Sequence, residues 1–388
     1  MKVVRWLVLV LALFLVAGCS YPIEDSSKDA VNSGGSTRSS TARNQTDKGD
    51  KSRDTTGNIS ADKENTNSSN STKTEGTQIP KVDSTKQDVK SEQFEKKNLL
   101  YVVLYYQDSS NNIVPVSRRV DRQEGIARAA VSGLIDHPVN REEIEYYGIF
   151  PVLPLGTKIL GLDIKQGTAI IDFNSKVLSY KDESAERNVI TSIVYTLTEF
   201  KSIDSVKILV EGKTPGKLKY GTDVSSILSR GNIMVNSKKA NLSLGSQKLD
   251  IYLFKHFNER FEYLIPLSIE MSRVNQDEVP SRIIELLARD YSSKKFYTQL
   301  PANARLLSST LRGNVLTLNF NPELKSYGGG TARENGLVKQ ILFSMKQVEG
   351  AEKVKILIDG KETVLQEGTE VSKEIAFPAV LNDFVDSD

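Results

Sequence analysis

The chain contains two copies of one internal pattern, and this repeat restricts the possible folds more than any other feature. The copies span 153–212 and 300–360. Each opens on Leu-Pro, continues through an apolar strand ending in Asp-Phe-Asn or Asn-Phe-Asn, and closes on Val-Lys-Ile-Leu followed three residues later by Gly. Phe173 corresponds to Phe320, and Gly212 to Gly360. A unit this long exceeds a solenoid repeat of roughly 20–50 residues and suffices for a small domain. The sequence therefore predicts two sister domains.

The first 18 residues have the features of a lipoprotein signal peptide. Lys2 and Arg5 precede an apolar run over 6–16, which is shorter than the roughly 20 residues needed to span a bilayer. The run ends in Val-Ala-Gly before Cys19, the only cysteine of the chain. This resembles a bacterial lipobox, in which the cysteine thiol is joined to a diacylglycerol. The alternative is an uncleaved signal anchor with an incidental cysteine. We expect lipidation of Cys19, which would anchor the protein stably to a membrane through two chains.

Residues 19–97 form a segment rich in Ser, Thr, Asn and Lys, with few apolar side chains. Such a segment cannot bury enough surface to offset the entropy lost on ordering, so we expect a disordered tether. As a flexible coil of about 75 residues it would hold the domains roughly 50 Å from the lipid on average.

Hydrophobic periodicity divides the remainder into similar sets of elements. We expect one domain over 98–222, a connection over 223–247, a second domain over 248–374, and a mildly acidic, frayed tail over 375–388. Each domain follows the order strand, strand, helix, strand, strand, helix, strand. This order predicts an α+β fold in which two helices cover one face of a small, largely antiparallel sheet. In domain 1 the predicted strands are 99–106, 113–116, 157–163, 168–173 and 206–212, with helices over 123–135 and 186–200.

The alternation of apolar residues predicts which side of each repeated strand is buried. Ala169, Ile171 and Phe173 share one face, and Leu316, Leu318 and Phe320 share the equivalent face in the second copy. In the helix that follows, the same positions are apolar in both copies at spacings of three and four residues. We therefore expect the same helix-on-sheet core twice.

Evidence for catalysis is sparse. Asp172 and Glu186 could be imagined as the carboxylate pair of a glycosidase. The second copy has Asn319 in place of Asp172, however, and Glu186 and its counterpart Glu334 are expected near helix N-termini, where the helix dipole favours negative charge. We favour structural roles for all of them, and we predict no enzymatic activity.

The remaining polar motifs do not predict a cofactor site. His137 and His256 occupy non-equivalent places, and neither has a second His or Cys at ligand spacing, so we expect no metal site. The glycine run 328–330 lacks the Lys and Ser/Thr of a phosphate-binding loop. Tyr146 and Tyr147 could line a partner or sugar surface, although packing is the commoner role of such residues. A net charge of +2 gives no electrostatic case for nucleic acid binding.

Taken together, these features resemble the GerM-type sporulation and germination lipoproteins, which carry two GerMN domains. In the first copy the residues that carry the resemblance are 113–119, the Leu-Pro-Leu-Gly-Thr turn 153–157, Ile-Asp-Phe-Asn at 171–174, Glu186, 196–200 and 206–212. In the second they are 300–301, 318–321, Gly330, Glu334 and 354–360. The second copy departs at Asn319 and in the turn 301–303, where Pro-x-Gly-Thr is lost.

The resemblance implies a membrane-anchored, extracytoplasmic protein of endospore-forming bacteria, located between mother cell and forespore. It implies domains similar to ring-building motifs of secretion systems, which associate laterally and have no catalytic residues. The leading hypothesis is therefore a structural component that supports a transenvelope sporulation channel and later germination, with channel proteins or other copies as partners. An exposed sheet edge would provide the association surface. The alternative is a lipoprotein that binds cell-wall glycan or peptide without catalysis, and a wall-degrading enzyme is a distant third.

Overall fold

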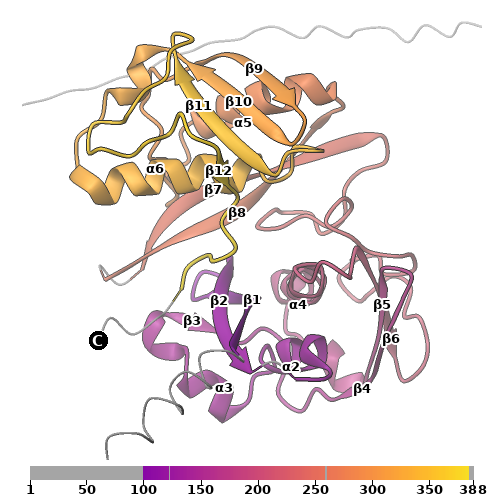
Figure 1. Ribbon diagram of the computed structural model, residues 1–388. Helices are drawn as coiled ribbons and strands as arrows, with labels where there is room; N and C mark the ends of the chain where they lie inside the picture. The colour runs from indigo at the N-terminus through magenta and orange to yellow at the C-terminus, as the bar shows by residue number, and fades with distance from the viewer. Residues whose placement is uncertain (1–98, 122, 258–259, 384–388) are drawn as a thin grey trace, which may run out of the picture. The chain divides into compact units, whose positions relative to one another are not determined.

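The computed structural model describes residues 99–121, 123–257 and 260–383, which lie within one compact unit (Figure 1). The predicted signal peptide, Cys19 and the predicted tether lie outside the described residues. Among the described helices, none combines the length and apolar character needed to cross a membrane.

Domain 1 consists of a hairpin-based sheet and a second, mixed sheet. Its elements in chain order are β1 (Leu99–Asp108), β2 (Ile113–Asp121), α2 (Ile126–Ser132), α3 (Pro138–Glu142), η1 (Glu145–Tyr147), β3 (Ile149–Phe150), β4 (Ile159–Lys165), β5 (Thr168–Phe173), η2 (Ser175–Leu178), α4 (Glu183–Leu197) and β6 (Ser205–Val210). The first sheet has the order β2-β1-β3 and the second β4-β5-β6. Strands β5 and β6 are parallel, since α4 carries the chain back across the sheet between them.

Domain 2 repeats this arrangement. Its elements are β7 (Ser246–Phe257), β8 (Phe261–Ser272), η3 (Gln276–Glu278), α5 (Val279–Leu287), η4 (Ser292–Lys294), β9 (Leu306–Arg312), β10 (Val315–Phe320), η5 (Pro322–Lys325), α6 (Gly330–Met345), β11 (Lys353–Ile358) and β12 (Ile375–Ala376). The hairpin β7-β8 corresponds to β1-β2, and β9, β10 and β11 correspond to β4, β5 and β6.

The predicted α+β class and tandem organisation are confirmed. The strands of each domain belong to two small sheets, because the hairpin pairs separately from the mixed sheet. The predicted core faces are also confirmed, since the three apolar residues of β5 and the three of β10 are at most 1% exposed. The first helix is shorter than predicted: α2 begins after Gly125, whose positive φ of 75° is non-helical, and ends at Ser132, with Gly133 as its C-cap.

Two segments outside the repeated elements contribute to the core, the connection between the domains and the C-terminal tail. The connection between the domains packs against domain 1, where Leu228 pairs with Val206 of β6 and both side chains are buried. The prediction that the tail frays is wrong for residues 375–383. Ile375 pairs with Val354 of β11, and Leu381 is 5% exposed. Figure 1 shows this segment running from β12 back to β2 of domain 1.

Candidate functional site

The first residue of the repeated Asp/Asn-Phe-Asn motif holds one turn in each domain. The Asp172 carboxylate accepts the backbone N–H of Gly212 at 3.0 Å, and the Asn319 side-chain oxygen accepts that of Gly360 at 2.7 Å. Both glycines have positive φ, 75° and 72°, in the turn after the last repeated strand. A carboxylate and an amide serve equally as acceptors there, which explains why the two copies differ. The predicted structural role of this position agrees with these contacts.

We therefore expect the Asp172→Asn variant to have a free energy of unfolding within about 0.5 kcal/mol of the wild-type value, because an acceptor for the Gly212 N–H is retained. Asp172→Ala removes it and should cost about 1 kcal/mol. Urea unfolding of both variants checks this. An equal loss in both would show that the negative charge itself is needed.

Glu186 and Glu334 lie near the starts of α4 and α6, as predicted, and have structural contacts beyond those predicted. Both carboxylates are fully buried. Glu186 accepts backbone N–H groups from Tyr220 and Thr222 at 2.7 and 2.9 Å. Glu334 accepts the equivalent N–H groups of the second domain and the Tyr327 hydroxyl, at 2.8, 2.9 and 2.5 Å. Each glutamate thus anchors a Gly-Thr loop to its helix.

Neither histidine forms part of a polar cluster that could bind metal. The His137 ring nitrogen accepts a long 3.4 Å bond from Val139 N–H at the start of α3. His256 stacks on Tyr297 at 4.7 Å between ring centroids. In the described part of the chain, no three His, Cys, Asp or Glu side chains gather as metal ligands. The glycine run lies at the start of α6, where Arg333 bonds the Gly328 carbonyl.

Tyr146 and Tyr147 lie against the second domain. Their rings are 5.6 and 5.3 Å from that of Phe261 in β8, and the Tyr263 hydroxyl donates to the Tyr147 carbonyl at 2.6 Å. Tyr147 is half-buried, whereas Tyr146 is 65% exposed. The pair therefore packs the two domains together, and Tyr146 leaves one aromatic ring available at the surface.

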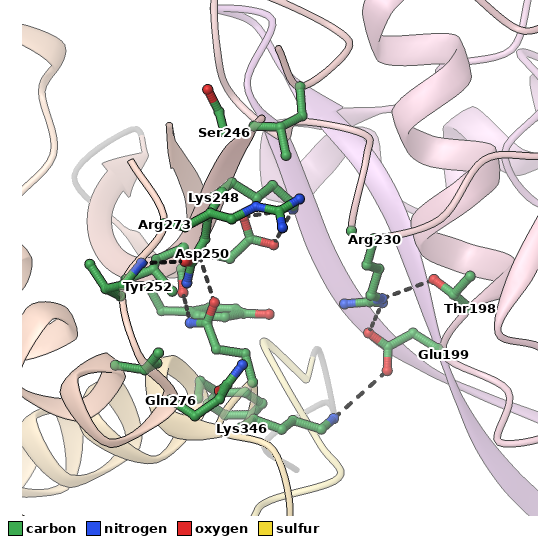
Figure 2. Close-up of a pocket in the computed structure, with 18 of the residues that line it drawn as sticks. Thr198, Glu199, Arg230, Ser246, Lys248, Asp250, Tyr252, Arg273, Gln276 and Lys346 are labelled. Carbon is green, nitrogen blue, oxygen red and sulfur yellow. Dashed lines mark hydrogen bonds and ion pairs between the residues drawn. The ribbon is translucent and has the colours of Figure 1, made fainter. Parts of the chain in front are cut away.

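A cleft of about 810 Å³ lies between the end of α4 and the start of β7 (Figure 2). Figure 2 shows Thr198, Glu199 and Arg230 on one wall and Lys248, Asp250 and Tyr252 on the other. The remaining lining residues are Lys201, Gly231, Leu242, Ser246, Gln247, Leu249, Arg273, Val274, Gln276, Val279, Phe343, Lys346 and Gln347.

Each wall of the cleft has a carboxylate with its charge neutralised. Glu199 accepts from Arg230 at 2.5 Å and from the Tyr105 hydroxyl at 2.7 Å. Burial opposes ionisation of Glu199, but Arg230 and Lys346 outweigh it, so its pKa is lower than usual.

On the opposite wall, Asp250 binds Lys248 at 2.7 Å and accepts the Tyr195 and Ser268 hydroxyls at 2.8 and 2.5 Å. Burial also opposes ionisation of Asp250, yet the lysine and the two hydroxyls lower its pKa.

An excess of positive charge remains in the cleft. Five cationic side chains line it against these two carboxylates. Arg273 and Lys201 have no ion-pair partner among the described residues, and Lys346 reaches Glu199 only at 3.9 Å. Lys346 is 46% exposed. The described lining contains no histidine or cysteine. The arrangement is suited to holding an anionic group rather than to proton transfer or nucleophilic attack.

Sequence reasoning missed this cleft because its walls come from different domains and its polar residues are not periodic. Glu199 and Asp250 are 51 residues apart, and no spacing pattern connects them. A usable signal was the charged pair Lys248 and Asp250 inside a strand whose neighbours are apolar, since a buried strand includes charges only when they are paired.

Comparisons with known proteins agree with this architecture. The family model described as "Germane: Sporulation and spore germination" matches residues 103–215 and 250–364, which is more than half of the chain. The spore germination protein GerM of Bacillus subtilis (strain 168) is 26% identical over 324 residues, covering 81% of this chain and 85% of that protein. The solved tandem GerMN domains of B. subtilis GerM superpose with a TM-score of 0.63 at 26% identity, covering 73% of this chain and 99% of that one. The chain therefore belongs to the Germane family of sporulation and spore germination proteins and contains two GerMN domains in tandem.

Proposed function

We propose that this protein is a lipid-anchored assembly component of endospore formation and germination. In this proposal Cys19 carries a diacylglyceryl group, and the GerMN domains lie outside the cytoplasm, between mother cell and forespore. There they support a transenvelope channel or ring. Membership of the Germane family supports the role in sporulation and germination. The lipobox-like sequence supports the anchor.

One structural observation carries the assembly role: each domain has an open sheet edge with two exposed apolar side chains at equivalent positions. Among the described strands, β4 pairs only with β5, and β9 only with β10. Leu160 of β4 is 48% exposed, and its equivalent Leu307 of β9 is 54% exposed. Ile164 and its equivalent Leu311 are 41% and 40% exposed. An open edge has unpaired N–H and C=O groups that can bind another strand, and exposed apolar side chains beside them favour such pairing.

The test replaces both edge leucines in an endospore-forming host. Leu160→Lys with Leu307→Lys should abolish self-association or co-purification with channel proteins and reduce sporulation, because charged side chains block edge pairing. Leu244→Lys is the matched control, since Leu244 is fully exposed but lies in a turn outside both edges. A wild-type chain that stays monomeric and without partners, in cells whose null strain sporulates normally, would refute the proposal.

Cys19→Ser is expected to move the protein from the membrane to the soluble fraction, because the thiol that would take the lipid is absent. Cell fractionation and metabolic labelling with a fatty acid measure this. The Cys19→Ser protein should also lose the label. An unchanged membrane fraction would instead favour an uncleaved signal anchor.

A second candidate function, binding of cell-wall peptides, is favoured by the cationic excess of the cleft. Wall peptides carry several carboxylates, which would be attracted to Arg273 and Lys346. Arg273→Gln with Lys346→Gln should weaken binding to purified peptidoglycan about tenfold, and added salt should weaken wild-type binding. Lys165→Gln, which removes an exposed surface cation of β4, is the control. Tyr146→Ala tests whether the exposed ring contributes. Equal binding of peptidoglycan by all variants would exclude the cleft as the binding site.

A further inference from the structure

The hydrogen bonds that join the two domains are reciprocal. Each hairpin has a Pro-x-Ser sequence in its second strand, ending at Ser117 in β2 and at Ser268 in β8. Each domain is also followed by an apolar residue and an asparagine, Val235-Asn236 and Leu381-Asn382. These four segments meet at the contact between the domains.

Each of these tails pairs with the hairpin of the other domain. Val235 N–H donates to Ser268 Oγ at 2.8 Å, and Ser268 N–H donates to the Val235 carbonyl at 2.9 Å. The second tail makes the same two bonds in the opposite direction. Leu381 N–H donates to Ser117 Oγ, and Ser117 N–H donates to the Leu381 carbonyl, both at 2.8 Å.

The two asparagine side chains extend this exchange. Asn236 bonds the N–H and C=O of Ile113 at 2.6 and 2.9 Å and the Pro266 carbonyl at 2.7 Å. Asn382 does the same with the domains interchanged, bonding Leu264 N–H and C=O at 2.9 Å and the Pro115 carbonyl at 2.7 Å. Each amide thus joins the edges of β2 and β8, whose proline residues cannot donate there. Both asparagines have positive φ, 54° and 51°.

We call this set the clasp: Ser117, Val235, Asn236, Ser268, Leu381 and Asn382. Each domain contributes one serine from a hairpin and one tail, so each has both halves of the contact. Such reciprocity is the property of an isologous, two-fold interface, in which a surface is complementary to itself. A clasp can therefore form between any two copies of these domains unless another contact forbids it.

One buried ion pair supplies that restriction. Tyr105 and Tyr252 face the equivalent prolines across their hairpins, and Asp108 and Lys255 lie three residues further along. Asp108 and Lys255 therefore occupy equivalent positions, and they contact each other at 2.6 Å with side chains 0% and 6% exposed. Pairing domain 1 with domain 1 would bury two carboxylates together, and pairing domain 2 with domain 2 would bury two ammonium groups. The contact can therefore form only between a first domain and a second domain.

The connection between the domains contains a suitable hinge. Between Asn236 and β7 the chain makes a turn at Ser243–Gly245, closed by a 3.1 Å bond from Ser246 N–H to the Ser243 carbonyl. Leu244 is fully exposed there, and Gly245 has a φ of 81°. The turn lies before β7 and outside every described helix and strand, so opening it breaks none of these elements.

We propose that the clasp also forms between chains: domain 1 of one chain pairs with domain 2 of a second chain, giving an exchanged dimer that contains two clasps. The partner is a second copy of this chain, and the Asp108–Lys255 pair restricts the contact to unlike domains. Exchange creates no new contact, because every bond of the clasp is re-formed between chains. The proposal does not depend on the edges of β4 and β9.

The experiment shortens the hinge in the chain from residue 19 onward, carrying Cys19→Ser. Deletion of residues 243–245 prevents the turn, so one chain can no longer close its own clasp, and we expect a dimer by light scattering. Inserting Gly-Ser-Gly after Leu244 is the matched control and should leave a monomer, since a flexible hinge favours closure within one chain. Adding Lys255→Glu to the deletion should abolish the dimer by placing two carboxylates together.

Two results would overturn the proposal: a deletion chain that stays monomeric, or a dimer that persists with Lys255→Glu. A persistent dimer that is lost with Leu160→Lys and Leu307→Lys would assign association to the sheet edges instead. If the deletion chain does not fold, the unmodified hinge is used. Chains labelled with a donor on domain 1 and chains labelled with an acceptor on domain 2 are refolded together at high concentration. Energy transfer in the dimer fraction supports exchange, and its absence refutes it.

Discussion

The Glu334→Gln variant is expected to lose about 3 kcal/mol of unfolding free energy, which makes it one of the two most damaging single changes that we predict. The buried carboxylate accepts the N–H groups of Glu367 and Thr369 and the hydroxyl of Tyr327. An amide of the same shape turns one acceptor into a donor facing an N–H group. Charge-assisted bonds of this kind contribute about 1.5–3 kcal/mol each, and an unsatisfied buried donor adds a similar cost.

Urea unfolding measures this loss, and Glu349→Gln is the matched control because Glu349 is exposed after α6. The control should change stability by less than about 0.5 kcal/mol. Equal effects of the two substitutions would show that the loop after β11 is held by other contacts.

Ionisation of the Glu334 carboxylate should also make the stability of the folded protein depend on pH. Burial opposes ionisation of Glu334, but hydrogen bonds from Thr369, Tyr327 and Glu367 prevail and lower its pKa from 4.5 to about 2. Because the folded-state pKa is depressed, this stabilisation is complete well above pH 4.5 and is lost as the pH falls from 4.5 towards 2. The melting temperature of wild type should decline in that window more steeply than that of Glu334→Gln. Parallel curves for the two proteins would contradict this.

The Lys255→Met variant is expected to destabilise the contact between the domains by about 3–5 kcal/mol. It removes the cation that is 2.6 Å from Asp108 and leaves a buried carboxylate without its counter-charge. Asp108 would keep the N–H bonds from Ser110 and Asn112 in the β1–β2 turn, so the hairpin itself should persist. The expected result is separation of the two domains before either unfolds, seen as two transitions in calorimetry instead of one.

Two further variants test the cause of this loss. Asp108→Asn combined with Lys255→Met should recover much of the stability, since neither charge is then buried alone. Lys346→Met removes a half-exposed lysine 3.9 Å from Glu199 and should cost less than about 1 kcal/mol. If the double variant is no more stable than Lys255→Met, the loss comes from the packing of the lysine stem and not from its charge.

Local periodicity was sufficient to predict the repeated part of the fold. The alternation in β5 and β10 and the spacing of apolar residues in α4 and α6 depend on neighbours along the chain, so they could be read directly. Comparing the two copies argued against a catalytic role for Asp172, because the second copy has Asn319 at that position and a residue that differs between copies is a poor candidate for shared chemistry. Glu186 and Glu334 were correctly predicted to be structural, but their backbone partners are 33–36 residues ahead in loops, which periodicity does not reveal.

The contact between the domains was not predictable in the same way. Ser117 and Leu381 are 264 residues apart, and the bonds between them involve single polar side chains and backbone groups. The composition of 375–388 suggests a frayed end, yet Leu381 and Asn382 occupy a gap between β2 and β8. A signal was present in the recurrence of Pro-x-Ser in both hairpins and of an apolar residue and asparagine after both domains. The match between the two recurrences becomes visible only when the chain is folded.

The reciprocity of the clasp has a consequence for the origin of the tandem. A gene encoding a single domain of this kind, with a neutral residue at the position of Asp108 and Lys255, would specify a symmetric homodimer. Duplication and fusion of that gene would yield the present arrangement of two domains without the need for a new interface. An acid in one copy and a base in the other would then make the halves obligate, non-interchangeable partners. Ancestral reconstruction offers a route to this: a one-domain chain with Asn at that position should dimerise, and one with Asp or Lys should not.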